Sequence, residues 1–351
     1  MADLPACGPA SRPPSGVFGA TLALAVLCSC APQTPARRAI VLAGQTMGTS
    51  YSVTLPGADP GEEGSVSAAV RAELELVDAR MSTYREDSEL SRFNRHASSE
   101  PFPLSEETHA VLAAAEAVSA LTGGAFDVTV APLVDAWGFG PRKRSEPPAR
   151  ADLERLRGHV GWQRLSVGAS DASATKKAPQ LQCDLSAIAK GYAVDRVSDT
   201  LARLGFADYL VEVGGEVRAG GRNAEGQLWR LGVERPDESG RLVQRILNVS
   251  DIAVATSGDY RNFREAEGGR LIHVLDPRTG RPAETRVASA TVLDPSAMRA
   301  DALATAMLVL GEAKGIELAD RENFEVLLLV REPEGRVREA PSARFRARMS
   351  H

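Results

Sequence analysis

The chain has 351 residues, of which 25% are charged, 43% hydrophobic and 5% aromatic. This composition is ordinary for a globular protein and argues against disorder, collagen-like repeats and a membrane protein with many spans. Because 41 Lys and Arg stand against 46 Asp and Glu, the net charge is −5, and nucleic-acid binding, which needs a basic face, is not expected. The length fits either two domains of about 150 residues or one large α/β domain.

The first thirty residues are typical of an export signal. Residues 16–27 are almost all apolar, which suits the core of a signal peptide but is too short for a membrane span of about 20 residues. The run ends in Leu27-Cys28-Ser29-Cys30, a pattern that resembles a bacterial lipobox with Cys30 as the lipidated residue. A plain secretory leader cleaved after Ala25 is the alternative.

We therefore predict a lipoprotein signal peptide over residues 1–29 and a lipid-anchored tether over residues 30–38. Two or three acyl chains at Cys30 would hold the protein firmly on a bilayer, where a single chain would not. The protein is then expected in the bacterial cell envelope, anchored to a membrane and facing the periplasm or the cell exterior.

The cysteines indicate that the exported chain has no internal disulfide. Cys7 and Cys28 leave with the signal peptide and Cys30 takes the lipid, so Cys183 is the only thiol left. Because Asp184 beside it disfavours a thiolate, we interpret Cys183 as a small buried residue rather than a nucleophile.

The first half of the exported chain alternates short strands with helices. Strands are expected over residues 39–42 and 50–55, and helices over residues 65–80, 105–121 and 188–204. Ser105 is a good N-cap for its helix, and Gly123-Gly124 ends it.

The second half is richer in strands, which are separated by Gly pairs and by Pro-Asp or Asp-Pro turns. They are predicted over residues 209–213, 216–219, 229–233, 242–247, 252–256, 272–275, 287–293 and 325–330. One further helix begins at Asp294 or Ser296 and stops at Gly311. The whole pattern predicts an α+β fold with mostly antiparallel strands and packed helices. The Arg-rich segment 332–351 is either a last hairpin or a loose tail near anionic headgroups.

Several common catalytic motifs are missing from the sequence. It contains no GxxxxGK[ST] loop, no HExxH, no GxSxG and no strand–GxGxxG–helix unit. None of its five histidines is paired with another at metal-ligand spacing. Zinc-dependent hydrolysis and a serine-hydrolase site are therefore disfavoured.

Two features have the chemistry to bind a charged ligand. Asp301 and Thr305 are four residues apart and lie on one face of a helix, as a hard cation such as Mg²⁺ would need. Such pairs are also common on solvated helix faces, so the spacing by itself is weak evidence. Lys190 lies near the start of a helix, where a positive charge is unfavourable unless an anion is close.

Eight segments taken together resemble the FAD:protein FMN transferase family, the ApbE type formerly called thiamine-biosynthesis lipoproteins. In chain order they are Thr46-Met-Gly-Thr49, Met81-Ser-Thr-Tyr84 through Phe93-Asn94, Gly124-Ala-Phe-Asp127 through Gly138-Phe-Gly140, Asp184-Leu-Ser-Ala-Ile-Ala-Lys-Gly191, Gly214-Gly-Glu216, Ser257-Gly-Asp259, His273-Val-Leu-Asp-Pro277 and Ala300-Asp-Ala-Leu-Ala-Thr305. They extend over residues 40 to 330 approximately, nearly the whole exported chain. The lipobox also suits this family, many members of which are exported lipoproteins.

The resemblance implies a fold and an activity. Members of the family bind FAD and Mg²⁺ and transfer the FMN half of FAD onto a Thr or Ser hydroxyl of a target flavoprotein, releasing AMP. A T-fold-like transferase domain over residues 39–331, with FAD in a cleft between two lobes, is therefore expected. The implied partner is an exported flavoprotein with a Thr or Ser acceptor.

The resemblance also implies site residues. FAD would be lined by Met47, Tyr84, Ala125, Phe126, Asp127, Asp184, Lys190 and Leu275. The metal would be held by Asp301, Thr305 and the backbone carbonyl of Ala187, because the alanine side chain offers no ligand atom. Ala304 stands where some relatives carry a metal-binding Asp, and Lys190 where some carry an acid.

The attacking hydroxyl needs a base that titrates near neutral pH, and His273 is the best-placed candidate. The alternative for His273 is a buried histidine that is hydrogen-bonded to Asp276 or to a carbonyl. Arg278 is a candidate for steadying phosphate charge. Two other functions are open at this point: an FAD pyrophosphatase that uses water as the acceptor and yields FMN and AMP, and a non-catalytic lipid-anchored flavin-binding protein.

Overall fold

The structure, a computed structural model, describes residues 37–349 except 143, 145, 237–241, 260–262 and 267–268. The predicted signal peptide and lipidated Cys30 lie outside the described residues. No helix within the described ranges combines the length and the apolarity that crossing a bilayer requires.

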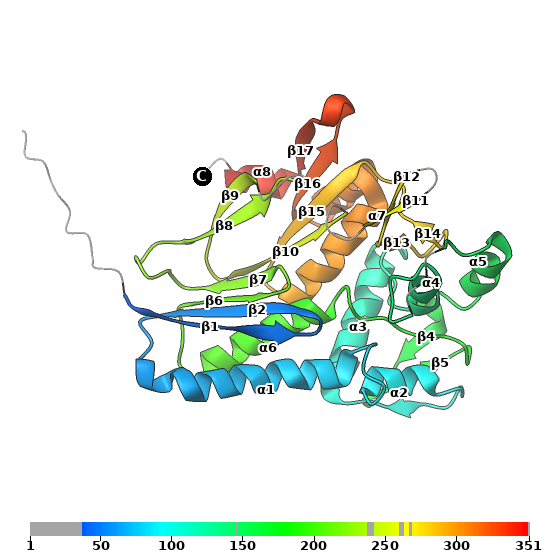
Figure 1. The fold of residues 1–351 in the computed structure, drawn as a ribbon, viewed down its shortest axis with the longest axis horizontal. Coiled ribbons are helices and arrows are strands. Elements are labelled where there is room, and N and C mark those ends of the chain that lie inside the picture. Colours follow the sequence, from blue (N-terminus) through cyan, green and yellow to red (C-terminus); the bar gives the residue numbers. More distant parts are fainter. Residues whose placement is uncertain are drawn as a thin grey trace, which may run out of the picture. The chain divides into compact units, whose positions relative to one another are not determined.

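An eight-stranded sheet forms the centre of the fold (Figure 1). In spatial order it contains β1 (Ala39–Thr46), β2 (Thr49–Pro56), β6 (Tyr209–Val213), β7 (Glu216–Gly220), β10 (Ile252–Gly258), β15 (Val287–Asp294), β16 (Glu325–Arg331) and β17 (Val337–Pro341). Each strand pairs with its neighbour in antiparallel fashion. The α+β class with mostly antiparallel strands is thereby confirmed.

Helices cover one face of this sheet. The largest apolar cluster combines sheet residues with the inner faces of α1 (Glu63–Met81), α3 (Glu106–Leu121), α6 (Ala189–Arg203) and α7 (Ala297–Arg321). In α1 the buried residues are Val66, Val70, Leu74, Val77 and Met81, spaced three or four apart so that they form one apolar stripe. The predicted helices 65–80, 105–121 and 188–204 are therefore confirmed to within two residues at either end.

A hairpin and a short helix cover part of the opposite face. β8 (Trp229–Glu234) pairs with β9 (Val243–Val249), and α8 (Ala343–Met349) places Phe345 in the same apolar cluster. Along β16, Leu327 and Leu329 join this cluster, whereas Leu328 belongs to the helix-side core. Covered on both faces, β15 and most of β16 are buried along their length.

A smaller group of elements adjoins the sheet at the right of Figure 1. Its apolar cluster contains Leu133, Trp137, Leu153 and Leu275, contributed by α4 (Ala131–Ala136), α5 (Arg150–Arg157) and β13 (Leu275–Asp276) among others. The remaining elements are η1 (Pro60–Glu62), α2 (Glu89–Arg95), β3 (Phe102–Pro103), η2 (Trp162–Arg164), β4 (Leu165–Val167), β5 (Ser173–Lys176), β11 (Phe263–Ala266), β12 (Gly269–Ile272), β14 (Arg281–Pro282) and η3 (Pro333–Gly335).

Two of the expected elements differ in the structure. The strand expected over 272–275 is divided, because β12 ends at Ile272 and β13 begins at Leu275. The helix that begins after Ser296 does not stop at Gly311. That residue breaks the helical geometry with φ +73° and ψ −179°, but a helix resumes and continues to Arg321. Burial of Leu318 against the core explains the resumption, since it gives the second helical stretch an apolar face of its own.

The Arg-rich segment after residue 331 takes the hairpin alternative. β17 pairs with β16 and extends the central sheet, and α8 follows directly. Arg344 and Arg348 both form ion pairs with Glu325 at the start of β16. The sheet thus continues past the expected boundary at residue 331.

We predict that Phe345 contributes strongly to stability. Its side chain is fully buried, so Phe345→Ala should lower the free energy of unfolding by about 3 to 5 kcal/mol, measured by denaturant titration. Met349→Ala is the control, because Met349 lies on the same helix with 41% exposure and should change stability by less than about 0.5 kcal/mol. Equal, small effects for both variants would mean that the C-terminal segment is not part of the core.

Cys183 should be chemically inert in the folded protein. It is fully buried, and burial together with the charge of Asp127 raises the pKa of its thiol. In a chain that begins at Ala31, where Cys183 is the only cysteine, a thiol reagent should label nothing in buffer and one site in denaturant. Rapid labelling of the native chain would contradict this.

Candidate functional site

Helices α6 and α7 are in contact at Gly191. A Cβ on this glycine would lie 2.2 Å from the carbonyl oxygen of Ala297, which belongs to the first turn of α7. The absence of a side chain lets the backbone amide of Gly191 donate to Asp301 Oδ2 at 3.1 Å. The first turn of α6 is thereby held against the second turn of α7.

Asp195 fixes the same contact one turn further along α6. Its carboxylate accepts from the backbone amides of Ala297 and Met298 at 2.9 and 3.0 Å, and from the Ser296 hydroxyl at 2.8 Å. A carboxylate at a helix N-terminus satisfies otherwise unpaired amides and interacts favourably with the helix dipole. Asp301 is therefore placed by a capped helix.

This helix contact brings three charged groups together. The Lys190 ammonium lies 3.4 Å from Glu216 Oε1 and 3.5 Å from Asp301 Oδ2, and it donates to the carbonyl of Ser186 at 3.1 Å. The anion that the position of Lys190 required is thus supplied by the protein's own carboxylates. Burial lowers the pKa of Lys190, but Asp301 and Glu216 outweigh it, so the pKa lies above its ordinary value.

Glu216 was not among the residues expected in the site. Its backbone follows Gly214-Gly215 at the start of β7, and the side chain is 5% exposed. Burial raises the pKa of Glu216, which the Lys190 ammonium opposes. The sequence signal was the position directly after two glycines within one of the family-like segments.

Lys190, Glu216 and Asp301 together form the charged group of the site. Thr305 and Ala187 lie close in sequence to two of its members. Thr305 is one turn after Asp301 on α7, and its hydroxyl is 3.1 Å from the Ser257 hydroxyl of β10. Ala187 is half-buried just before α6, and Ala304 is fully buried. The structure therefore places Asp301 and Thr305 on one face of α7, as the spacing predicted.

The available donors are those of a magnesium-type site. Asp301, Glu216 and Thr305 offer only oxygen atoms, and Glu216 Oε2 is buried without a hydrogen-bond partner among the described residues. Within those residues no group of three or more His, Cys, Asp or Glu side chains could hold a metal ion. The group fits Mg²⁺, which usually takes one or two carboxylates and completes its shell with water and substrate phosphate.

Tyr84 and Asp184, two residues predicted to line FAD, lie near each other. Tyr84 is 66% exposed, and burial of part of its ring together with the charges of Asp184 and Asp135 raises its pKa. Asp184 accepts from the amide of Ser186 at 2.8 Å, and the carbonyl of Ser186 accepts from Lys190. The turn from Asp184 to Lys190 therefore connects this pair to the charged group.

The buried members of the predicted FAD lining have structural contacts. Asp127 accepts from the Thr129 amide and hydroxyl and from the Trp162 amide, at 2.7 to 2.8 Å. Burial raises the pKa of Asp127, which these hydrogen bonds oppose. Ala125 and Phe126 are almost fully buried, so a ligand would meet the backbone of this loop more readily than its side chains.

Met47 and His273 each lie at a turn. Met47 has φ +46° and forms the tip of the β1–β2 hairpin with Gly48 at φ +72°. His273 is half-buried between β12 and β13, with its ring edge-on to Phe139 at a centroid distance of 6.4 Å.

Leu275 and Arg278, which follow His273, contact other parts of the protein. Leu275 is buried in the small apolar cluster beside Trp137. The Arg278 guanidinium, a candidate for phosphate binding, forms a two-pronged ion pair with Asp276 at 2.8 and 2.9 Å.

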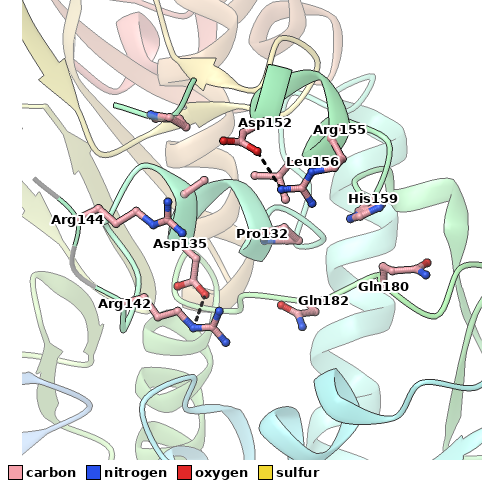
Figure 2. A pocket seen from close by; sticks show the side chains of 12 residues that line it. Pro132, Asp135, Arg142, Arg144, Asp152, Arg155, Leu156, His159, Gln180 and Gln182 are labelled. Atoms are coloured by element: carbon pink, nitrogen blue, oxygen red, sulfur yellow. Dashed lines mark hydrogen bonds and ion pairs between the residues drawn. The ribbon is translucent and has the colours of Figure 1, made fainter. Parts of the chain in front are cut away.

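A cavity of about 400 Å³ lies between α4 and α5 (Figure 2). Arginine side chains enter it in pairs with acids: Arg142 with Asp135 at 3.8 Å and Arg155 with Asp152 at 3.1 Å. Within the described part of the chain, none of the residues predicted to bind FAD or metal lines this cavity.

Comparisons with known proteins agree on one family. A model described as the ApbE family matches residues 47–328. A curated protein of Vibrio cholerae named FAD:protein FMN transferase is 43% identical over 335 residues, which cover 94% of this chain and 98% of that protein. The protein of the same name from Escherichia coli K12 is 37% identical, over 87% and 89% of the two chains.

Solved structures give the same result. The flavin transferase ApbE from Vibrio cholerae superposes with a TM-score of 0.82, covering 89% of this chain and 99% of that one at 43% identity. The flavinyl transferase ApbE from Pseudomonas stutzeri, in its apo form, also gives 0.82, at 38% identity over 90% and 98% of the chains. Since the family model and the relatives each match most of its length, this chain belongs to the ApbE family.

Proposed function

We propose that this protein transfers the FMN half of FAD to a Thr or Ser hydroxyl of another protein and releases AMP. The observation that carries the proposal is the contact of Lys190 with Glu216 and Asp301. Thr305 lies one turn after Asp301, and the turn that begins at Asp184 leads directly to Lys190. Relatives that align along nearly all of their length carry the name FAD:protein FMN transferase.

The chemistry fits these residues. The acceptor oxygen forms a bond to the phosphorus of the FMN half while the bond to AMP breaks, and AMP leaves with the electron pair. A Mg²⁺ held by Asp301, Thr305 and the carbonyl of Ala187 would neutralise the negative charge that develops on the phosphate oxygens. Tyr84 offers an exposed ring on which part of FAD can stack. We assign FAD to a cleft that has Tyr84 and Asp184 on one side and the charged group on the other.

His273 is the proposed base that accepts the proton of the attacking hydroxyl. A neutral imidazole nitrogen can take this proton and hold it as the oxygen attacks. Its ring is half-buried and lies edge-on to Phe139.

Two alternatives differ in the acceptor or in the chemistry. Water in place of the protein hydroxyl would make the chain an FAD pyrophosphatase. A lipid-anchored protein that binds flavin without reaction would not need Asp301 and Thr305, and both are present on α7.

The acceptor is proposed to be an exported flavoprotein, and the enzyme a lipoprotein of the bacterial envelope. The support is the sequence Leu27-Cys28-Ser29-Cys30 at the end of an apolar run. The acyl anchor on Cys30 would hold the catalytic domain near a membrane surface.

The proposal is tested by mixing the enzyme with FAD, Mg²⁺ and a flavoprotein fragment that carries an acceptor Thr. We expect the fragment to gain the mass of one FMN while one AMP is released, and both changes to stop with EDTA. Release of AMP without a gain in mass would favour the pyrophosphatase, and bound FAD without either product would favour a binding protein.

Asp301→Asn should lower the transfer rate by about 100-fold or more, because it removes a metal-binding charge. Asn keeps an oxygen that can accept from Gly191, so the helix contact should survive. The rate is measured as FMN transfer at saturating FAD. Glu317→Gln, an exposed change on the same helix, is the matched control and should leave the rate unchanged. A fully active Asp301→Asn enzyme would remove Asp301 from the metal site.

His273→Ala should slow transfer by about 100-fold or more while FAD affinity changes little, because a base acts on the acceptor and not on flavin binding. Single-turnover transfer and flavin fluorescence titration separate the two effects. His96→Ala, at the end of α2, serves as the control. Equal loss of FAD affinity and rate would assign His273 to binding instead.

A further inference from the structure

The ammonium of Lys190 is held between two carboxylates that are almost out of contact with water. The side chains of Asp301 and Glu216 are 2% and 5% exposed, and each has an oxygen within 3.5 Å of Lys190 Nζ. The ammonium also donates to the Ser186 carbonyl at 3.1 Å. Its donors are therefore directed into the protein's own acidic group.

The aliphatic part of the Lys190 side chain is also closely packed. Gly214 packs over it with φ +60°, and a Cβ there would lie 3.1 Å from Lys190 Cδ and 2.9 Å from Thr49 Cγ2. Only glycine combines that backbone conformation with so close an approach. Lys190 is thus confined between the glycine turn before β7 and the second turn of α7.

The acidic side chains of this group outnumber its cation. Two carboxyl groups face one ammonium, and Glu216 Oε2 has no hydrogen-bond partner among the described residues although it is buried. A buried acceptor without a partner is costly, unless a ligand completes it. This oxygen of Glu216 is therefore available to a second cation.

We propose that Lys190 is an internal counter-cation that positions Glu216 and Asp301 and competes with the divalent metal for them, rather than a contact to FAD. The proposal rests on the metal site of the proposed function and adds Glu216 to the residues that tune it. Lys190 keeps the two carboxylates together before the metal arrives. Once the metal is bound, two cations share the same buried acids and repel each other, so Lys190 weakens metal binding.

The test is a titration of the purified full chain with Mn²⁺ alone. Electron paramagnetic resonance measures the concentration of free Mn²⁺ at each step. Manganese prefers the same oxygen ligands as magnesium. We expect Lys190→Met to bind Mn²⁺ about tenfold more tightly and Glu216→Gln about tenfold more weakly, within the range usual for coupled sites. Lys314→Met, an exposed charge removal on α7, is the matched control and should leave the affinity within about twofold.

A double variant keeps the test valid if Lys190→Met does not fold. Lys190→Met with Glu216→Gln removes one charge of each sign, and it should bind Mn²⁺ about tenfold more tightly than Glu216→Gln alone. Equal affinities for these two proteins, or weaker binding by Lys190→Met than by the native chain, would overturn the proposal.

FAD affinity in EDTA provides a second readout. If Lys190 serves the carboxylates, Lys190→Met should bind FAD within about twofold of the native chain, and a tenfold loss would overturn the proposal in favour of a direct flavin contact. Asp301→Asn separates the proposal from the function on which it rests. A native chain without an Asp301-dependent Mn²⁺ site would contradict both, whereas a normal site that is indifferent to Lys190 would contradict this inference alone.

Discussion

The contact between α6 and α7 is the constraint on which the rest of the site depends. Gly191 allows the two backbones to touch, and Asp195, four residues later on the same helix, caps the first turn of α7 through two amides and a hydroxyl. In both contacts a carboxylate accepts from backbone amides, so separating the helices would leave those amides unpaired. The positions of Lys190 and Asp301 follow from this contact.

The central sheet supplies the other half of that geometry. Helices cover one face and the β8–β9 hairpin with α8 covers part of the other, so the middle strands are buried on both sides. Ser257 on β10 and Glu216 at the start of β7 are presented to α7 and α6 from this rigid frame. A site built on packed strands and helices holds its groups in one arrangement, which metal and phosphate chemistry needs.

The charged group in the site is not explained by stability. Moving two carboxylates and an ammonium out of water is expensive, and their mutual attraction repays that cost only with good geometry and full hydrogen bonding. Here both ion-pair distances are near 3.5 Å and one carboxylate oxygen lacks a partner among the described residues. Perturbed, densely charged groups of this kind are typical of functional sites. The arrangement therefore fits carboxyl groups that bind a cation.

Local signals in the sequence predicted most of the helices and strands and the Asp301–Thr305 pair of the site. Ser105 caps its helix as its position predicted, and Ser296 is the one of the two predicted caps that is used. The i,i+4 spacing of Asp301 and Thr305 put both on one face of α7. These features depend on residues a few positions apart, where backbone geometry alone decides. The family-like segments named the same regions without showing how they meet.

Only the tertiary structure decided which distant residues meet. Glu216 reaches Lys190 from another element, Asp195 caps a helix that begins about a hundred residues later, and Phe139 lies against His273. The same holds for Gly311, where a local stop signal is overridden because Leu318 beyond it packs into the core. Such contacts arise from the burial of apolar faces across the whole chain, which no short stretch of sequence encodes.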